Sequence, residues 1–586
     1  MLLGLLFLGC APARQPKVIV LAIDGCDPKL LRRMIDQGKL PHFQKLEKMG
    51  GLWDLQTSNP PQSPVAWATF LTGLDPGGHG IFDFLHRDPN TLQPVTSMSV
   101  VKDGKYQLQR KAPAFWSYLK KHHISTVAMR VPCHFPAPAD GATSLTGMGT
   151  PDLMGGYGTY SYYSELAPRE LNGGSWVRVV AQGNQVAASL IGPAQQSAAL
   201  QLTLDRKNGQ LLLQTCGQRR LLKAGEWSDW VPVSLGNTPG IVRFYLRSLA
   251  PLGLYASPIN LDPRRPSMPI SQPPSYAAHL ARCCGLFYTQ GMAEDTKALS
   301  SAVLEDPAYL EQSRTVLEEN RRLLRLGLRE FHKGLFFFYI SHLDLQSHMY
   351  WRTLNQDGVV EKAYQDVDEV LGDVLARLDA DTTLWVLSDH GFARFDRVFD
   401  LNRWLKEGGW LDLEAGQPLQ QANWSQTRAY GVGFNGLYLN LKGRESKGLV
   451  DPKESQQLLT ELRQKLKQVR DPSTGQTVFV EVYPSSEIYS EAHRQNAPDL
   501  VLGYRAGYRA AWETALGQCS KQVFRDNSEH WNGDHLMDPS QVPGVLLCSR
   551  PIRLANPGLV DMAPTLLRQF QVEPPAQMKG RNLLEE

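Results

Sequence analysis

The chain has 586 residues, of which 42% are hydrophobic and 20% are charged, and its formal net charge is +3. This length exceeds the roughly 250–300 residues that a single hydrophobic core fills, so we expect one large domain with an insertion. The ordinary composition excludes a disordered or fibrous protein. Basic residues are spread along the chain without a long run, which argues against nucleic-acid binding or a membrane-surface protein.

The N-terminal segment, residues 1–15, predicts an export leader. Its apolar stretch Leu2–Gly9 is too short to span the roughly 30 Å of a bilayer. Cys10 follows directly and resembles the cleavage site of a bacterial lipoprotein, in which the cysteine becomes lipidated. Phe7 and Leu8 depart from the usual residues, and a frayed apolar terminus is the alternative. We therefore expect an exported protein of the bacterial cell envelope, anchored by lipid at Cys10 on the periplasmic face of a membrane or on the cell surface.

The other cysteines predict no cross-linked framework. Seven remain after Cys10, an odd number, and their scattered positions match no zinc-finger spacing. We expect buried free thiols at all of them. They are Cys26, Cys133, Cys216, Cys283, Cys284, Cys519 and Cys548.

Strand-like and helix-like segments alternate along most of the chain. Continuous apolar runs predict buried strands at residues 17–23, 334–340, 383–387 and 542–548. Apolar residues at three- and four-residue spacing predict helices at residues 29–49, 306–332 and 362–378. The alternation predicts an α/β fold: a doubly wound, mostly parallel sheet flanked by helices.

One segment, residues 175–266, breaks this alternation. Short β-like runs separated by Gly, Asn and Pro turns occur at residues 177–180, 200–204 and 241–246. A proline-rich stretch at 263–274 is typical of a linker returning to the core. The predicted organisation is a leader at 1–15, a core from 16–174 continued at 267–586, and an inserted β-rich module at 175–266.

Three aspartates follow predicted strands. Asp24 comes after the first strand, Asp344 after the run at 334–340, and Asp389 after the run at 383–387. Open α/β sheets bind ligands outside the carboxyl ends of their strands, where such residues converge. A single Asp-Gly pair is more often a simple turn, so the prediction rests on all three together.

Three histidines accompany these aspartates. The spacing of Asp344 and His348 places both side chains on one face of a helical turn. His390 is adjacent to Asp389, and Gly391 allows the tight loop that would aim both at one point. His535 lies in a turn before the last strand, from which it could enter the same crevice.

Three carboxylates and three imidazoles are the donor set expected for zinc, with manganese or iron as alternatives. The number of ligands fits two divalent cations. Such a site carries a formal charge of +1 before a substrate binds, so it would attract a small phosphate ester.

The candidate nucleophile is Ser63. It precedes Pro64, which predicts Ser63 as the N-cap of a helix running to Gly73. The helix dipole favours an anion at this end. An ordinary N-cap explains the same residues, and only the neighbouring cation ligands favour a nucleophile, because a coordinated hydroxyl is acidified.

Together these residues resemble the alkaline phosphatase superfamily, and within it the type I phosphodiesterase/nucleotide pyrophosphatase group. The resemblance extends over nearly the whole chain after the leader. Its anchors are LAIDG at 21–25, SPVAWATFLTGLDPGGHGI at 63–81, DLQSH at 344–348, SDHGF at 388–392 and NGDH at 532–535.

The resemblance implies two cation sites and a serine nucleophile. One cation would be bound by Asp344, His348 and His535. The other would be bound by Asp24, Ser63, Asp389 and His390. The implied reaction is hydrolysis of a phosphate ester through a phosphoseryl intermediate.

The sequence departs from this family at the phosphate-binding asparagine that usually follows His-Gly-Ile, because Phe82 and Asp83 stand there. Arg87 and Arg130 could replace the missing clamp, although structural arginines are the alternative that we favour. A dianionic monoester would need a further cation in the pocket, so the residues slightly favour a phosphodiester, and both a phosphodiesterase and a phosphomonoesterase remain open. Trp67 occupies the position at which a sulfatase has an arginine, which excludes that activity.

Two other functions remain open from the sequence. The same site could serve a phosphomutase, which returns the phosphoryl group to a second substrate oxygen. Alternatively, the chain could be an inactive lipoprotein that uses the insert to bind a partner.

Overall fold

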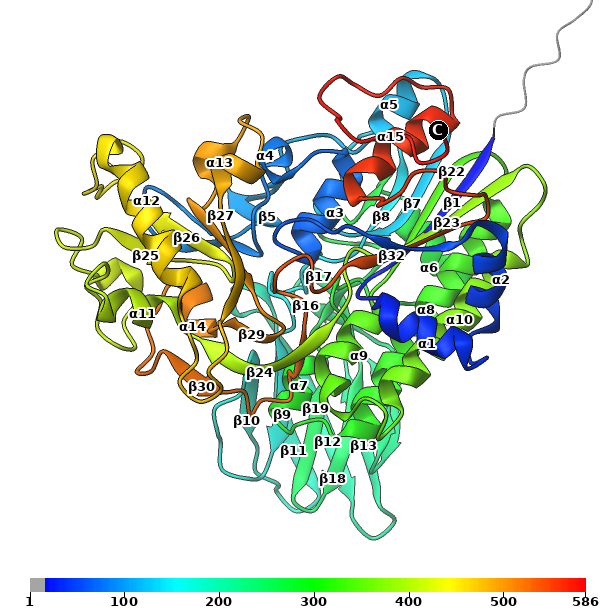
Figure 1. The fold of residues 1–586 in the computed structure, drawn as a ribbon. Coiled ribbons are helices and arrows are strands. Elements are labelled where there is room, and N and C mark those ends of the chain that lie inside the picture. The colour runs from blue at the N-terminus through cyan, green and yellow to red at the C-terminus, as the bar shows by residue number, and fades with distance from the viewer. Residues whose placement is uncertain (1–15, 586) are drawn as a thin grey trace, which may run out of the picture.

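The computed structural model describes residues 16–585 and is built around an eight-stranded sheet in the order β2-β32-β23-β1-β22-β7-β8-β21 (Figure 1). Strands β23, β1, β22, β7 and β8 are parallel, whereas β2, β32 and β21 are antiparallel to their neighbours. The bounds are β1 Lys17–Ile23, β2 Leu52–Leu55, β7 Thr126–Val131, β8 Thr143–Thr146, β21 Ser271–Gln272, β22 Gly334–Ile340, β23 Thr382–Leu387 and β32 Gly544–Cys548. The predicted α/β fold with a mostly parallel sheet is confirmed.

Helices cover both faces of this sheet (Figure 1). One face carries α1 Pro28–Asp36, α2 Pro41–Gly50, α8 Asp306–Glu330 and α10 Val359–Leu375, and the other carries α3 Ser63–Thr72, α5 Trp116–Lys121 and α15 Leu559–Gln569. The side chains of β1 show why both faces must be covered. Ile19 and Leu21 join the core beneath the first helices, whereas Val18 and Val20 join the core beneath α3 and α15. Successive residues of a strand point to opposite faces, so a run without polar residues is buried on both.

The helix expected at residues 29–49 is two helices, and the single-helix prediction was wrong. α1 ends at a C-cap on Gln37, and Gly38 follows with φ of +71°. α2 then begins with Pro41. A left-handed glycine after one helix and a proline opening the next are the usual signals of a break.

The β-rich module forms three sheets beside the core; two lie in the lower part of Figure 1, and the third, with β16 and β17, lies near the centre of the view. Their orders are β10-β9-β19-β18-β15, β11-β12-β13-β14 and β16-β17-β20. The bounds are β10 Gly174–Arg178, β11 Gln185–Ile191, β12 Ser197–Asp205, β13 Gln210–Thr215, β14 Gln218–Lys223, β15 Glu226–Trp227, β16 Val231–Leu235, β19 Leu252–Ala256 and β20 Asn260–Leu261. The first sheet includes β9 (Tyr160–Ser164), which precedes the expected start at residue 175. The run expected at 241–246 is divided between β17 (Thr238–Val242) and β18 (Phe244–Leu249), which belong to different sheets.

A further lobe lies on the left of Figure 1 and comes from the second core segment. Its sheet has the order β25-β26-β28-β27. The bounds are β25 Ala429–Gly431, β26 Gly436–Leu439, β27 Phe479–Pro484 and β28 Leu500–Tyr504, and α11 Leu401–Glu407 and α12 Pro452–Lys467 pack on it. This second sheet was not predicted from the sequence, because its short strands lack the long apolar runs of the central one.

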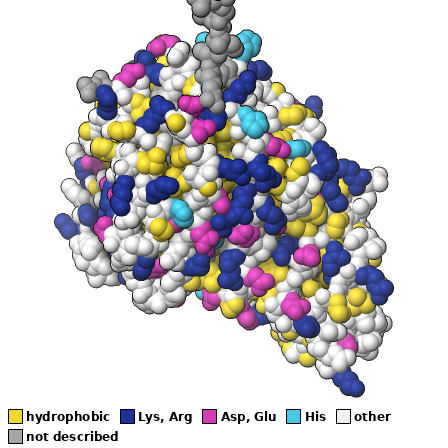
Figure 2. All heavy atoms as spheres, turned by 90° about the vertical axis from the view of Figure 1, so that its right-hand side faces the viewer, with side chains coloured by type: hydrophobic (Ala, Val, Ile, Leu, Met, Phe, Trp, Pro, Cys, Tyr) yellow, Lys and Arg dark blue, Asp and Glu magenta, His cyan; other side chains and the backbone are white. Residues whose placement is uncertain are grey.

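The surface carries mixed charge. Figure 2 shows lysine and arginine side chains gathered near the middle of the face that lies on the right of Figure 1, with acidic side chains among them. On this side Arg321 and Arg325 of α8 pair with Asp373 of α10 at 2.6 and 3.0 Å. Among residues 16–585, no helix combines the length and apolar character needed to cross a membrane.

The seven cysteines within residues 16–585 are free thiols, as expected, but they are not all buried. Cys26, Cys133, Cys519 and Cys548 are buried. Cys216 and Cys283 are exposed, and Cys284 is partly exposed. Cys216 lies with φ of +48° in the turn between residues 215 and 218, where its Sγ contacts the backbone of Ser234. Cys10 lies outside the described residues.

Candidate active site

The first ligand group forms where two neighbouring parallel strands end. Ala22 of β1 pairs with Leu387 of β23, so Asp24 and the Asp389-His390 pair emerge side by side. His390 Nε2 lies 3.2 Å from Asp389 Oδ2 and 3.5 Å from Asp24 Oδ1. Gly25 turns the chain with φ of +69° at a crowded point, because a Cβ there would lie 2.8 Å from the Cα of Asp344. All three ligand side chains are buried.

Ser63 joins this first group as the first residue of α3. Its Oγ lies 3.1 Å from His390 Nε2 and 3.4 Å from Asp24 Oδ1. The N-cap of α3 is Gln62 rather than Ser63, so the predicted cap was wrong by one residue. Ser63 makes no capping hydrogen bond to its own helix and instead faces the ligand group, at the helix end that favours an anion.

The second ligand group consists of Asp344, His348 and His535. Asp344 and His348 lie one turn apart on α9 (His342–Tyr350), with His348 Nε2 3.3 Å from Asp344 Oδ1. His535 follows β31 (Gly533–Asp534), and its Nε2 lies 3.8 Å from Asp344 Oδ1. The rings of His390 and His535 stack with centroids 3.5 Å apart, which places the two groups side by side.

The unpaired atoms of these groups fit bound cations. Asp344 Oδ1 and Asp389 Oδ2 are buried and accept no hydrogen bond. Within each group, one donor atom per residue lies within 4.8 Å of the others. Buried carboxylate oxygens without hydrogen-bond donors are costly unless a cation satisfies them.

The histidines are held in the tautomer that leaves Nε2 available. An Nδ1–H of His348 donates to the carbonyl of Gly533 at 2.8 Å, and that of His535 donates to Pro61 at 2.7 Å. Nδ1 of His390 lies 3.1 Å from the carbonyl oxygen of Gly391. Such backbone acceptors are the usual partners of cation-binding histidines.

Burial shifts the titration of the acidic ligands. Burial and the neighbouring Asp344 carboxylate raise the pKa of Asp24 to about 8, and burial with Asp24 raises the pKa of Asp389 well above its usual range. Burial also lowers the pKa of His390, and the nearby His535 lowers it further. The protein alone therefore disfavours charge here, and positive charge from bound cations would reverse the shift of the carboxylates.

Several supporting residues were not predicted from the sequence. The Oδ2 atom of Asp24 accepts hydrogen bonds from Trp67 Nε1 at 2.8 Å and Tyr339 Oη at 2.6 Å. Trp531 stacks on His348 with ring centroids 3.7 Å apart. Tyr339 lies in a predicted strand and could have been inferred from its polar hydroxyl in an otherwise apolar run, but the other contacts depend on tertiary structure.

Asp534 is a further supporting residue next to His535. Its Oδ1 accepts the backbone N–H of His535 at 2.7 Å, and its Oδ2 accepts Trp531 Nε1 at 2.9 Å and Arg509 Nη1 at 2.8 Å. Burial opposes ionisation of Asp534, but the charges of Arg509, His348 and His535, together with a backbone hydrogen bond from Leu536, outweigh it and lower the pKa of this carboxyl. Asp534 thus fixes both the His535 loop and the indole that supports His348.

The two arginines considered as phosphate clamps have structural partners. Arg87 Nε donates to Glu445 at 2.9 Å, and Arg130 Nη1 donates to the carbonyl of Tyr288 at 2.9 Å. Asp83, at the departure from the family motif, accepts hydrogen bonds from Gln62 and from the amides of residues 434 and 435. It joins the start of α3 to the second lobe, which explains a carboxylate at this position.

The sequence model of the type I phosphodiesterase/nucleotide pyrophosphatase family matches residues 18–213 and 268–530. The chain belongs to this family. Family membership indicates a phosphoester hydrolase of the alkaline phosphatase superfamily. The matched ranges contain Ser63 and every ligand except His535, and they omit residues 214–267 of the β-rich module.

Comparison with solved structures returns proteins of similar extent. Phosphonoacetate hydrolase from Sinorhizobium meliloti 1021, in complex with phosphonoacetate, has a TM-score of 0.49 at 12% identity, over 95% of this chain and 96% of that one. Murine ectonucleotide pyrophosphatase/phosphodiesterase 5 has a TM-score of 0.42 at 13% identity, with the same coverage. No curated protein matches the sequence.

Proposed function

We propose that the chain is a two-cation phosphodiesterase that acts through a phosphoseryl intermediate on Ser63. The observation that carries this proposal is the position of Ser63 Oγ, 3.1 Å from His390 Nε2, beside two adjoining groups of Asp and His ligands. A serine that only supported the fold would not need six Asp and His side chains around it.

Asp344, His348 and His535 would hold one cation, and Asp24, Asp389, His390 and Ser63 the other. Zinc fits the donor set best, with manganese or iron as alternatives. When bound, two divalent cations would neutralise phosphate charge and lower the pKa of a serine hydroxyl or a water molecule.

The residues of the chain then have separate tasks. Ser63 attacks phosphorus, the bond to the leaving oxygen breaks, and a phosphoseryl ester forms. Water then cleaves this ester and regenerates the serine. Trp67 and Tyr339 keep Asp24 in place through both steps, and the N-terminus of α3 favours the anion.

A diester is the favoured substrate class because neither arginine considered as a clamp is available. Both guanidinium groups are buried and bonded to Glu445 or to backbone carbonyls. A monoester carries one more negative charge than a diester and would need such a cation.

The proposal includes export and anchoring by lipid at Cys10. It rests on the apolar leader and the cysteine that follows it. Replacing Cys10 by Ala should release the protein from the membrane fraction, whereas an unchanged distribution would contradict anchoring at this residue.

The test of the proposed reaction is hydrolysis of bis-nitrophenyl phosphate and nitrophenyl phosphate by the zinc-loaded enzyme. We expect faster hydrolysis of the diester and loss of activity by at least about 10³-fold in Ser63→Ala. Ser63→Thr should retain part of the activity, because it keeps a hydroxyl on the same atom.

Ser175→Ala, at an exposed position of the β-rich module, is the matched control. Full activity in Ser63→Ala would contradict the nucleophile. With a sugar phosphate as the substrate, an isomerised sugar phosphate without release of inorganic phosphate would identify a phosphomutase instead.

A further inference from the structure

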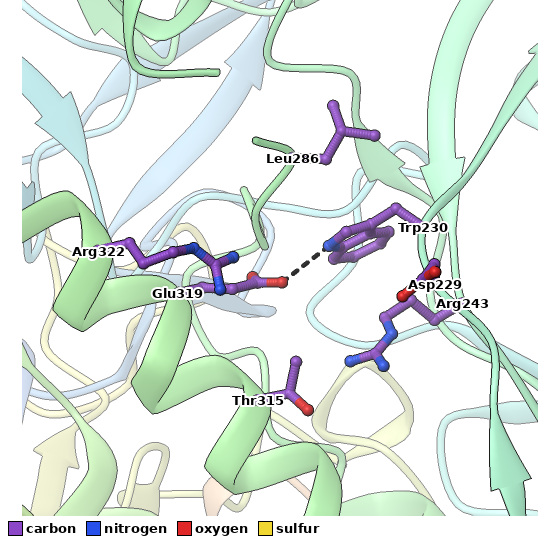
Figure 3. Close-up of a pocket in the computed structure, with 7 residues that line it drawn as sticks. All are labelled: Asp229, Trp230, Arg243, Leu286, Thr315, Glu319 and Arg322. Atoms are coloured by element: carbon purple, nitrogen blue, oxygen red, sulfur yellow. Dashed lines mark hydrogen bonds between the residues drawn. The ribbon is translucent and has the colours of Figure 1, made fainter. Parts of the chain in front are cut away.

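A cavity of about 340 Å³ lies between the β-rich module and α8, apart from the ligand groups (Figure 3). Asp229, Trp230 and Arg243 line it from the module, Thr315, Glu319 and Arg322 from α8, and Leu286 from the loop after α6 (Tyr276–Cys284). The three residues from the module fall in the segment that the family model does not match.

Arg243 is the unusual member of this lining. It lies between β17 and β18, where the chain passes from one sheet to another, and only 8% of it is exposed. Its Nε donates to the carbonyl of Ser228 at 2.9 Å, and its guanidinium lies 5.4 Å from the centre of the Trp227 ring. Nη1 is buried and has no hydrogen-bond partner.

Figure 3 shows this guanidinium pointing into the cavity, with Arg322 and Glu319 across from it. A buried guanidinium N–H without an acceptor costs several times the net gain of an ordinary hydrogen bond. Such a group is retained where a ligand oxygen completes it, because arginine matches carboxylate and phosphate in geometry as well as in charge.

Glu319, the buried acidic residue of the cavity, does not accept a hydrogen bond from Nη1 of Arg243. Both oxygens of Glu319 already accept hydrogen bonds, one from Trp230 Nε1 at 2.9 Å and one from the backbone N–H of Tyr288 at 2.8 Å. Burial raises the pKa of Glu319, whereas its hydrogen bonds and the charges of Arg243 and Arg322 act in the opposite direction. Asp229 is exposed at the rim.

The remaining lining suits the uncharged part of a ligand. Trp230 packs edge to face on Tyr288, with centroids 4.5 Å apart, and Leu286 joins this apolar cluster. Thr315 adds a hydroxyl on the α8 side, and Arg322 adds an exposed positive charge at the mouth. The cavity thus combines the buried guanidinium of Arg243, the exposed guanidinium of Arg322 and an apolar wall.

We propose that this cavity is a second binding site, which holds a small organic anion through an oxyanion head group placed against Arg243. The head group would be a carboxylate or a phosphate, with Arg322 closing over it. The site is separate from the proposed phosphodiesterase reaction and does not depend on it.

The test counts anions bound per chain. Equilibrium dialysis of the metal-loaded protein with labelled inorganic phosphate, and separately with labelled succinate, should show one more bound anion in the wild type than in Arg243→Met. The probe that gives this difference identifies whether the head group is phosphate or carboxylate. Crystals soaked in selenate should show an anomalous selenium peak beside Arg243.

Arg219→Met, an exposed arginine on β14 (Gln218–Lys223) of the same module, is the matched control and should keep both counts. Arg322 is exposed, and Arg322→Met leaves the buried guanidinium of Arg243 in place. This variant should therefore weaken the extra binding by about tenfold without affecting folding. It provides the decisive measurement if thermal melting shows that Arg243→Met does not fold.

The proposal is overturned if neither probe shows a difference between the wild type and these two variants. Where phosphate is the probe that binds, it is also overturned if the selenium peak is absent beside Arg243. Neither result would bear on Ser63, whose role is measured by hydrolysis alone.

Discussion

The two ligand groups of the candidate active site are built in different ways. The first is fixed by the sheet, because Asp24 and Asp389 end neighbouring parallel strands and Ser63 begins a buried helix. The second combines one turn of α9 with a loop, and Asp534 holds that loop through Arg509 and Trp531. The first group therefore depends on the packing of the central sheet, whereas the second depends on a few polar contacts that a single substitution removes.

The largest effects are expected from the ligands themselves. Asp389→Asn and Asp344→Asn should each bind one divalent cation per chain instead of two and lose on the order of 10³-fold in kcat/KM. Plasma mass spectrometry of the dialysed proteins measures the cation content. Asp396→Asn on β24 (Ala393–Phe399) is an exposed control that should keep both cations. If either variant still bound two cations, the proposal that each ligand group holds one cation would be contradicted.

Asp534→Asn tests the polar support of the second group alone. We expect one cation to bind about 10- to 100-fold more weakly while the other is unchanged, because the amide cannot accept all the hydrogen bonds of the carboxylate. Competition with a coloured chelator measures both affinities. Asp526→Asn is the control, because Asp526 lies on β30 (Phe524–Asp526) with an exposed side chain that pairs with Arg397. Equal weakening of both cations would show that the groups are not supported separately.

Trp67→Phe tests the packing of the first group. It removes the hydrogen bond to Asp24 but keeps a buried ring, so we expect activity to fall by about tenfold while Tyr339 still holds the carboxylate. Trp385→Phe is the matched control, because Trp385 is equally buried and its Nε1 has no hydrogen-bond partner. Similar losses in both variants would assign the effect to packing rather than to the hydrogen bond.

The smallest expected effect is a pH dependence of the free energy of unfolding caused by His79. This residue contacts α3, the helix that carries Ser63 of the first group. His79 contacts Thr69 of α3 through Nε2 at 3.0 Å. Burial, together with the charges of Arg110 and His493, lowers the pKa of His79 from 6.5 to about 3. Below pH 6.5 the unfolded chain binds a proton that the folded chain excludes, so this contribution is present above pH 6.5 and is lost as the pH falls towards 3.

His79→Gln should remove that dependence. The difference in free energy of unfolding between the wild type and the variant should be smaller at pH 5 than at pH 6.5, by about 2 kcal/mol. Urea unfolding at the two pH values measures it. A difference independent of pH would show that His79 does not titrate between them.

The contrast between the groups also explains what the sequence could predict. Asp24, Asp389 and their strands were identifiable because a doubly buried parallel strand is a continuous apolar run with a polar residue at its end. The pair Asp344 and His348 was identifiable from helical spacing. His535 was the weakest of these predictions, because nothing in its local sequence indicates which edge of the sheet it reaches.

The supporting contacts were beyond the sequence for a physical reason. Trp67 and Asp24 are 43 residues apart, and Asp534 and Arg509 are 25 apart, so no local pattern relates them. The division of one apolar run between β17 and β18 was equally hidden, since residues 241–246 form a continuous run of apolar residues interrupted only by Arg243. Because the chain passes from one sheet to another at this break, the side chain of Arg243 lines the cavity beside α8.

The antiparallel direction of β32 determines when the ligand groups become complete during synthesis and folding of the chain. Because β32 is antiparallel to β23, the residues before it, including His535, reach the edge at which the parallel strands end. A growing chain therefore has its first group complete after residue 390 but lacks a ligand of the second until almost all of it has been synthesised. Until then β23 has no partner on that side of the sheet, so the unfinished chain carries an open sheet edge and an incomplete catalytic centre.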